Sequence, residues 1–383
     1  MKIKVLHFID FFLPETMNWI QEMLNQSSDA CAHYLCCRYY NQSDLINITK
    51  IKDVGILSGY PISFYSKFKA LVVEKNRLIS IRKFIENEEI QILHFHFGNV
   101  ALRFSELINE FAEKCLISLY GYDYEYLPTK DSTTKGKYLS FSKRGVRFAV
   151  EGTFSKKLLE SYGIESQNIV IIQMIFHRST PKRIPSLTKP IILAQIATYT
   201  EKKGQDILLM ALAKSKFKNR FKIIFHGEIA NQKYYSRLQI IADNYQLKNV
   251  FFGGKLSVIE YIKLLGNIHI LVNLSKRTKL NDTEGGCPVS IKDALTLGKP
   301  VFTTNHCDIP EIAVHGYNAW IAKENDIEDS ANMLDQIASL SQSMYVAFSN
   351  HCLESTKTKL NSNLTAQQLA EAYKLIINEN LFA

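Results

Sequence analysis

The sequence has 383 residues, of which 46% are hydrophobic and 22% charged, and its formal net charge is +9. This length and composition are typical of a globular protein with about two domains, and they exclude a disordered, fibrous or low-complexity chain. No apolar run approaches the roughly 18 to 20 residues that a membrane-spanning helix needs. The positive charge suits a nucleic acid, an anionic membrane or a phosphorylated small molecule, but no nucleic-acid-binding motif accompanies it.

The first ten residues hold two lysines and a short apolar run that Asp10 interrupts. A signal peptide needs a longer apolar region and a small-residue cleavage site. We therefore expect a first buried strand and a cytoplasmic protein. The seven cysteines form no Cys-x-x-Cys pair and show no zinc-like spacing with histidine, so we expect reduced, buried thiols and no metal site.

Along the first half, short apolar runs alternate with stretches of helical periodicity. We expect strands at residues 4–8, 33–38, 90–95, 115–119, 148–150 and 169–172, and helices at 16–25 and 66–87. Basic residues gather between positions 130 and 147, namely Lys130, Lys135, Lys137, Lys143, Arg144 and Arg147. Two interpretations stay open for them: a solvated surface, or peripheral contact with an anionic membrane or a lipid-linked diphosphate.

Residues 177–190 hold three prolines without clear periodicity, which is typical of a linker. The alternation then resumes, with strands expected at 191–195, 221–225, 250–252, 268–272 and 300–303 and helices at 204–214, 231–245, 258–265 and 288–297. A final helix, at 364–377, is a candidate to pack back on the first half.

Repeated strand–helix units with short connections predict parallel sheets covered by helices on both faces. We therefore expect an α/β protein with two Rossmann-like domains, at residues 1–176 and 191–362, joined by the linker 177–190 and followed by the C-terminal segment 363–383. Ligands of this fold bind beyond the carboxyl ends of the strands, so we expect the site in an inter-domain cleft. Neither half has Gly-x-Gly-x-x-Gly after its first strand, which disfavours a dinucleotide dehydrogenase.

The most informative segment runs from Asn281 to Val301. Glu284 stands before two glycines, and a helix is expected to open near Pro288 and to carry Asp293. Glycines let a backbone approach a ligand closely, and the start of a helix suits an anion such as a diphosphate. Two carboxylates around such a turn suit a ligand that bears hydroxyl groups as well as phosphate. A plain helix start, with acidic residues favoured by the helix dipole, is the structural alternative.

This segment resembles the donor-binding motif of retaining glycosyltransferases with the GT-B architecture, specifically glycosyltransferase family four. The resemblance extends over Gly298-Lys-Pro-Val301 and Asn305-His-Cys-Asp-Ile-Pro-Glu311, which are similar to the bacterial exopolysaccharide and colanic-acid-type branch. The segment Glu201-Lys-Lys-Gly-Gln205 resembles the phosphate-binding Lys-Gly of the family. The resemblance covers nearly the whole chain and is strongest between Lys203 and Glu311.

In the second half, the resemblance implies a donor site for a nucleotide-diphosphate sugar, with UDP or GDP left open. Lys203 and the turn backbone would stabilise the diphosphate, Glu284 would bind sugar hydroxyls and Asp293 the ribose. Two positions depart from the family pattern: Thr198 replaces an arginine, and Asp293 replaces a glutamate. The implied donor-binding residues are Thr198, Lys203, Glu284, Gly285, Gly286, Cys287, Pro288, Val289 and Asp293.

In the first half, Leu93-His-Phe-His-Phe-Gly98 and Leu119-Tyr-Gly-Tyr-Asp123 resemble two strand ends of the family, with Tyr120 where many members carry histidine. The resemblance implies an acceptor side that includes His96, Gly121 and Asp123, with Tyr120 counted among the catalytic candidates beside Glu284 and Lys203. Structural roles are the alternatives: a hydrogen bond for His96 and a turn for Asp123. We do not expect His94 and His96 to form a metal pair.

The resemblance implies a metal-independent enzyme that transfers a sugar with retention to a glycan or lipid-linked acceptor in the synthesis of a bacterial surface polysaccharide. No other cofactor is expected. A non-catalytic GT-B protein that binds a nucleotide sugar or glycan is the main alternative, since Thr198, Tyr120 and Asp293 depart from the common pattern. A sugar-nucleotide epimerase shares the architecture but fits the Glu284 segment less well.

Overall fold

The structure is a computed structural model, and it describes residues 2–12, 18–40, 51–53, 67–174, 184, 186–358 and 363–380. The chain divides into two compact units. The first unit comprises Met1–Phe176 together with Asn363–Ala383, and the second comprises His177–Ser362. Most of the predicted linker lies outside the described residues.

The first unit is built on a parallel sheet with the strand order β3-β2-β1-β4-β5-β6-β7. Its strands are β1 (Ile3–Phe12), β2 (Cys31–Tyr40), β3 (Ile51–Asp53), β4 (Ile92–His96), β5 (Cys115–Ser118), β6 (Arg147–Val150) and β7 (Ile169–Ile171). All the strands that periodicity predicted in this half are present, and the short β3 is additional. Near-continuous apolar runs in β4, β5 and β6 agree with their position inside a parallel sheet, where both faces are buried.

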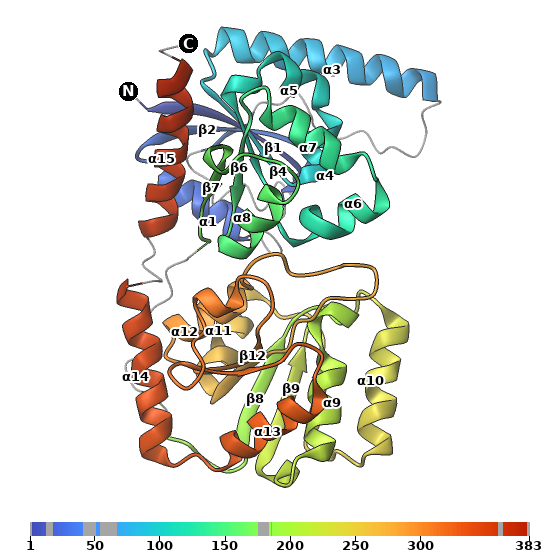
Figure 1. The fold of residues 1–383 in the computed structure, drawn as a ribbon, viewed down its shortest axis with the longest axis vertical. Helices are drawn as coiled ribbons and strands as arrows, with labels where there is room; N and C mark the ends of the chain where they lie inside the picture. The colour runs from blue at the N-terminus through green and yellow to red at the C-terminus, as the bar shows by residue number, and fades with distance from the viewer. Residues whose placement is uncertain are drawn as a thin grey trace. The chain divides into compact units, whose positions relative to one another are not determined.

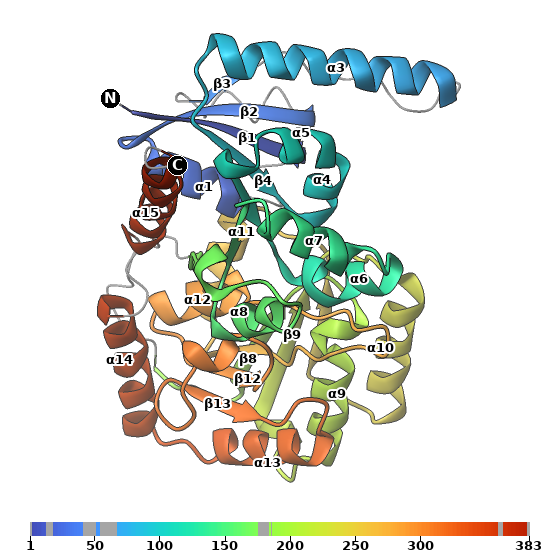
Figure 2. The same ribbon diagram turned by 45° about the horizontal axis from the view of Figure 1, so that its top comes forward.

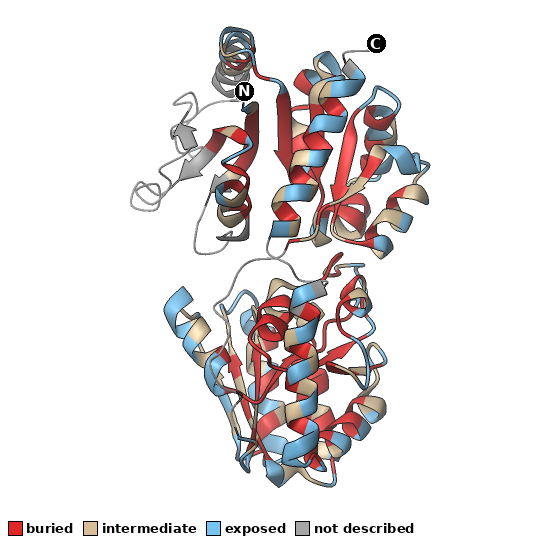
Figure 3. Ribbon diagram, turned by 90° about the vertical axis from the view of Figure 1, so that its left-hand side faces the viewer, coloured by how far each residue is buried: buried red, intermediate tan, exposed pale blue. Residues whose placement is uncertain are grey.

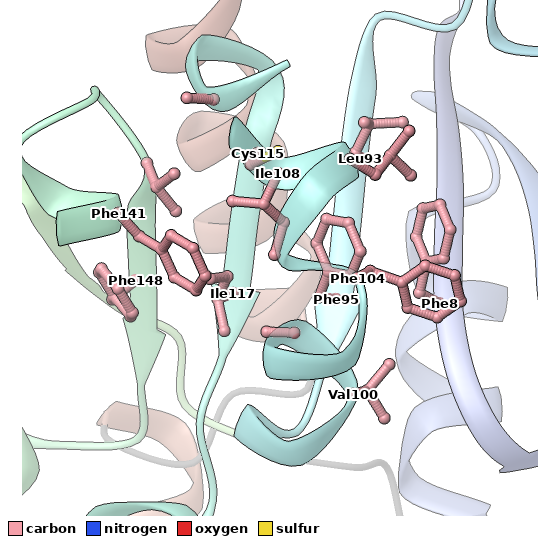
Figure 4. Close-up of a cluster of buried hydrophobic side chains, with 14 of the residues drawn as sticks. Phe8, Leu93, Phe95, Val100, Phe104, Ile108, Cys115, Ile117, Phe141 and Phe148 are labelled. Atoms are coloured by element: carbon pink, nitrogen blue, oxygen red, sulfur yellow. The ribbon is translucent and has the colours of Figure 1, made fainter. Parts of the chain in front are cut away.

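Helices pack on both faces of this first sheet (Figures 1 and 2). They are α1 (Asn18–Ser27), α3 (Lys67–Asn87), α4 (Gly98–Arg103), α5 (Ser105–Glu110), α6 (Leu127–Lys130), α7 (Thr134–Ser142), α8 (Thr153–Glu160) and α15 (Asn363–Asn380). A core on one face includes the stacked rings of Phe8 and Phe95, whose centroids are 4.3 Å apart, beside Phe104 and Phe148 (Figure 4).

The other face of the first sheet is covered by α1 and by the C-terminal helix α15, which lie side by side (Figures 1 and 2). Leu369, Tyr373 and Ile376 of α15 join the apolar core under β1 and β4. Thr365 also donates a hydrogen bond to the Gln173 carbonyl at 2.7 Å. The end of the chain therefore completes the first unit, because the sheet face under α15 would otherwise expose its apolar side chains.

The second unit has a parallel sheet with the strand order β10-β9-β8-β11-β12-β13. Its strands are β8 (Ile191–Ile196), β9 (Phe221–His226), β10 (Val250–Gly253), β11 (Ile270–Asn273), β12 (Val301–Thr304) and β13 (Ala319–Ala322). Its helices are α9 (Gln205–Lys214), α10 (Gln232–Asn244), α11 (Val258–Asn267), α12 (Val289–Thr296), α13 (Ile327–Ala338) and α14 (Gln342–Thr358). Figure 3 shows mainly buried strands at the centre of each unit and exposed outer helix surfaces.

Both sheets reverse their strand order once, between β1 and β4 in the first unit and between β8 and β11 in the second. The carboxyl ends of the strands on either side of such a reversal splay apart, which makes this point the usual ligand site of the fold. The α/β prediction with two Rossmann-like domains is confirmed. Among the described helices, none combines the length and apolarity that crossing a bilayer requires.

One member of the predicted basic cluster does not belong to it. Arg147 begins β6 and is buried, where it donates to the Gln167 carbonyl and pairs with Glu379 of α15. Its charge therefore anchors the C-terminal helix rather than an exposed surface. Lys130, Lys135, Lys137, Lys143 and Arg144 are exposed.

Candidate active site

The connection after β8 carries Lys203 to the carboxyl edge of the second sheet. Residues 201–203 form a short turn that ends at Gly204, which has the left-handed φ of 67°. A Cβ at Gly204 would lie 2.0 Å from the carbonyl oxygen of Leu274, just beyond β11. Only glycine fits this approach, and it brings the turn against the end of the strand on the other side of the reversal.

Lys203 and Glu284 meet at this edge as an ion pair. The Lys203 ammonium lies 2.7 Å and 2.8 Å from the two carboxylate oxygens of Glu284, and both side chains are largely buried. The Ser275 hydroxyl lies 2.9 Å from one of these oxygens. Burial opposes ionisation of Glu284, but the charges of Lys203 and Lys202 outweigh it and lower the pKa of the carboxyl to about 2. Glu284 is therefore an anion at neutral pH.

His306 holds the backbone of the Glu284 turn. The Glu284 N–H donates to His306 Nε2 at 3.2 Å, so Nδ1 carries the imidazole proton and donates to Glu324 at 2.8 Å. The sequence motif around 305–311 contained His306, but nothing in it indicated Glu324 as the partner.

Two further ion pairs flank the Lys203–Glu284 pair, and sequence analysis predicted neither. Lys202 lies 2.9 Å from Asp282. Lys276 lies 3.0 Å from Asp206, a buried pair that also receives a 2.9 Å hydrogen bond from Tyr234. Their partners lie about 70 to 80 residues apart in sequence, beyond the reach of any local spacing rule.

The predicted glycine turn leads directly into α12. Gly285 has a φ of 73°, Gly286 and Cys287 are buried, and Pro288 precedes Val289, the first helical residue. The start of α12 has no side-chain cap, so its opening N–H groups suit an anion.

Asp293 and Thr198 have partners that the sequence did not predict. Asp293 is 2% exposed and accepts a 2.9 Å hydrogen bond from the Tyr261 hydroxyl of α11. The Thr198 carbonyl accepts a hydrogen bond from the Gln205 side chain at 2.9 Å. A ribose ligand of Asp293 would therefore share its carboxylate with Tyr261.

In the first unit, the catalytic candidate Tyr120 contacts two of the predicted acceptor-side residues. The Tyr120 hydroxyl lies 3.1 Å from His96 Nδ1, and the Tyr120 N–H donates to the Asp123 carboxylate at 3.0 Å. Burial raises the pKa of Asp123 to about 7, against the lowering effect of backbone N–H groups that include that of Gly98. Gly121 precedes the turn that carries Asp123.

His94 and His96, which we did not expect to form a metal pair, lie side by side. Residues two apart in a strand face the same side, and their rings stack with centroids 4.1 Å apart. Sequence analysis also missed His7 and His33, which lie buried beside them. Ligand atoms of His7, His94 and His96 lie within 4.8 Å of one another, so the arrangement admits a metal ion. Every one of their ring nitrogens already has a protein hydrogen-bond partner, however.

Tyr120 also lines a small cleft at the carboxyl edge of the first sheet, with a volume of about 10 Å³. Its other lining residues include the polar Ser118 and Glu151 and the apolar Met23, Ile172 and Met174. A cavity of this size holds about one water molecule or one hydroxyl group.

Comparison with known proteins finds a family that the second unit resembles. Residues 178–351 match the family described as glycosyl transferases group 1. The chain is 24% identical over 223 residues to the putative colanic acid biosynthesis glycosyltransferase WcaL of Salmonella typhimurium, a match over 57% of this chain and 54% of the relative. The match thus spans about half the length of that relative. The amylovoran biosynthesis glycosyltransferase AmsK of Erwinia amylovora is 23% identical over 85% of this chain and 79% of its own.

Solved structures share the fold over the whole chain. A glycosyltransferase from Rickettsia africae superposes with a TM-score of 0.77 at 19% identity, covering 98% of this chain and 99% of its own. HepE of Anabaena, in complex with UDP and glucose, superposes with a TM-score of 0.76 at 14% identity, covering 97% and 100%. The chain therefore has the GT-B fold, and its residues 178–351, under half of its length, are similar to the glycosyl transferases group 1 family.

Proposed function

We propose that the protein is a retaining glycosyltransferase that moves a sugar from a nucleotide-diphosphate donor to a glycan or lipid-linked acceptor in bacterial surface polysaccharide synthesis. The observation that carries this proposal is the Lys203–Glu284 pair at the strand-order reversal of the second unit, beside the uncapped start of α12. The relatives named for colanic acid and amylovoran synthesis support the polysaccharide class.

The donor would bind against the second unit. Its diphosphate would take the Lys203 ammonium and the backbone N–H groups of the turn from Gly285 to Val289, which supply positive potential where negative charge develops on the leaving group. Glu284 would then accept from the sugar hydroxyls, and Asp293 from the ribose. Lysine and helix start together make a metal ion unnecessary for this step.

In the absence of a donor, Glu284 neutralises Lys203. Diphosphate binding therefore exchanges one ion pair for another, and it does not require a bare buried lysine. The exchange leaves the Glu284 carboxylate available for hydroxyl groups of the transferred sugar. UDP is the first nucleotide to test, because HepE carries it in its solved complex.

The acceptor would bind the first unit near His96, Tyr120, Gly121 and Asp123. Cytoplasmic location, with peripheral membrane contact through the exposed lysines near residue 135, remains part of the proposal. No side chain is assigned as a general base, and a donor phosphate oxygen would take the acceptor proton.

The test is thermal-shift screening of the purified protein against UDP, GDP, CDP, ADP and dTDP and their common sugars. Lys203→Ala should abolish the shift, whereas Lys214→Ala should keep it. Lys214 is the matched control because it is an exposed lysine of the same unit, on α9, paired at the surface with Glu328. Product release from the donor that binds, with candidate acceptors, then tests transfer.

A shift with one nucleotide that Lys203→Ala removes would support the donor site and identify the base. Binding without any transfer would favour the non-catalytic alternative. The absence of a shift with every nucleotide would overturn the donor assignment and would make Thr198, which replaces the expected arginine, the first position to examine.

A further inference from the structure

Three buried histidines of the first unit form a continuous hydrogen-bonded chain. His33 of β2, His7 of β1 and His96 of β4 are at most 2% exposed. His33 Nδ1 lies 2.9 Å from His7 Nε2, and His7 Nδ1 lies 3.0 Å from His96 Nε2. The chain ends at the Ser27 hydroxyl, 3.1 Å from His33 Nε2, and at the Tyr120 hydroxyl, 3.1 Å from His96 Nδ1.

The imidazoles in this chain are neutral at neutral pH. Burial, the largest cause, lowers the pKa of His33 to about 4 and that of His96 to about 3, and it lowers the pKa of His7 well below its usual value. A neutral imidazole donates from one nitrogen and accepts at the other. The direction of the first hydrogen bond therefore determines the direction of all the others.

The Ser27 end sets that direction. The Ser27 hydroxyl donates to the Met23 carbonyl at 2.8 Å, which leaves its oxygen as an acceptor for His33. The Leu24 carbonyl also hydrogen-bonds His33, and a carbonyl can only accept. His33 therefore donates from Nε2 toward α1 and accepts from His7 Nε2.

The same reasoning passes along the chain to the cleft. His7 Nδ1 accepts from His96 Nε2, so His96 Nδ1 must accept from the Tyr120 hydroxyl. All three histidines carry their proton on Nε2. The phenolic proton of Tyr120 is thereby committed to His96, so its oxygen, which also hydrogen-bonds Ser118, acts only as an acceptor beside the cleft that Tyr120 lines.

We infer that this histidine chain is a positioning device that makes Tyr120 an obligate hydrogen-bond acceptor, so that the cleft selects a neutral ligand hydroxyl over an anion. Glu151 supports the selection, since a carboxylate in the cleft wall also accepts from hydroxyl groups and repels phosphate. Met23, Ile172 and Met174 offer apolar contact to a sugar face. The assignment of the ligand hydroxyl to a sugar rests on the proposed function. The direction of the hydrogen bonds between Tyr120 and Ser27 is independent of it.

His94 is the matched control within the molecule. It is fully buried and stacks on His96, but its nitrogens bind Tyr373 at 2.7 Å and Ser118 at 2.7 Å instead of the chain histidines. Substitution of His94 should therefore leave the path from Ser27 through His33, His7 and His96 intact, and it reaches Tyr120 only through Ser118, which also hydrogen-bonds Tyr120.

Nitrogen NMR of histidine-labelled full-length protein at neutral pH tests the inference. We expect His7, His33 and His96 each to show a single form with the proton on Nε2. His7→Asn should let His96 populate both neutral forms, whereas His94→Asn should leave His96 unchanged. The wild-type spectrum decides the direction of the chain even where a variant does not fold.

Two NMR results would overturn the proposed hydrogen-bond direction: a proton on Nδ1 of any of the three histidines, or an imidazolium. A stoichiometric metal ion in the purified protein would overturn it as well. An unchanged His96 in folded His7→Asn would also overturn it. Titration with glucose should move the His96 Nδ1 resonance, whereas titration with inorganic phosphate should not. A response to phosphate alone, or no response to glucose, would overturn the inference that the cleft selects a neutral hydroxyl group. The predicted histidine spectrum does not depend on nucleotide binding. A protein that binds no nucleotide but shows this spectrum would therefore contradict only the proposed function.

Discussion

The two sheets of this protein have the same strand-order reversal, yet they place opposite chemistry at it. At the reversal of the second unit, Lys203 and Glu284 form a charged pair with further ion pairs beside it. At the reversal of the first unit, His7 and His96 belong to a neutral hydrogen-bonded chain. The fold thus provides a location only, and the side chains decide whether it binds an anion or a hydroxyl group.

The largest expected contrast is in the response to acid. His33 and His96 have folded-state pKa values of about 4 and about 3, below the usual 6.5. The unfolded chain protonates these histidines first, so below about pH 6.5 each of them removes about 1.4 kcal/mol of stability per pH unit from the first unit. Asp123 has a folded-state pKa of about 7, above its usual 3.8, and acts in the opposite direction, which offsets one histidine. Hydrogen exchange measured by peptide between pH 7 and 4.5 should show earlier opening of β1, β2 and β4 than of β8 and β11.

The second unit shares this loss only through His269, a buried histidine beside β8 whose pKa burial also lowers. Its further loss should come at lower pH. The folded-state pKa of Glu284 is about 2, below its usual 4.5, so the stabilisation is present above about pH 4.5 and is lost as the pH falls toward 2. Equal acid sensitivity of both units above pH 4.5 would contradict the comparison.

The next largest effect is expected from Lys203→Met. Removal of one partner of a buried pair leaves Glu284 uncompensated and should cost about 3 kcal/mol of unfolding free energy. The double variant Lys203→Met/Glu284→Gln should recover most of that loss, because it removes both charges. Urea unfolding of the two single variants and the double variant gives the coupling energy, and simple additivity would show that the pair is not coupled.

A smaller loss is expected when a neutral bond is removed from the first unit. Tyr373→Phe deletes the hydrogen bond between α15 and His94 and should cost about 1 to 2 kcal/mol, because a buried imidazole nitrogen loses its partner. Tyr317→Phe removes an exposed tyrosine hydroxyl, bonded to Glu354, and serves as the control. A loss as large as that of Lys203→Met would contradict the distinction between charged and neutral sites.

The smallest effect concerns Asp293. Its carboxylate accepts from Tyr261, so Tyr261→Phe should release it for ribose and tighten nucleotide binding by about threefold, well under 1 kcal/mol. Isothermal titration with the nucleotide identified by thermal shift measures the change. Weaker binding in Tyr261→Phe would indicate that Tyr261 orients Asp293 instead of competing for it.

The strand and helix order was largely predictable from local periodicity, and so was the glycine turn at Glu284, because both depend on residues close in sequence. The Lys203–Glu284 contact was indicated only through a family resemblance, since 81 positions separate its partners. Arg147 shows the limit of local reasoning. It looked like one more surface cation, but its partner Glu379 lies 232 positions away on α15.

The sequence alone determined the α/β architecture, because the alternation of apolar and polar residues is a local property of the chain. The GT-B expectation and the candidate donor residues came from the family resemblance of short motifs, which is also read from the sequence. The tertiary structure alone decided which side chains share a hydrogen bond. The chain through His33, His7 and His96 exists only because three strands align their side chains on one buried face. Whether a buried histidine donates or accepts depends on its neighbours in space, and no spacing along the sequence encodes that direction.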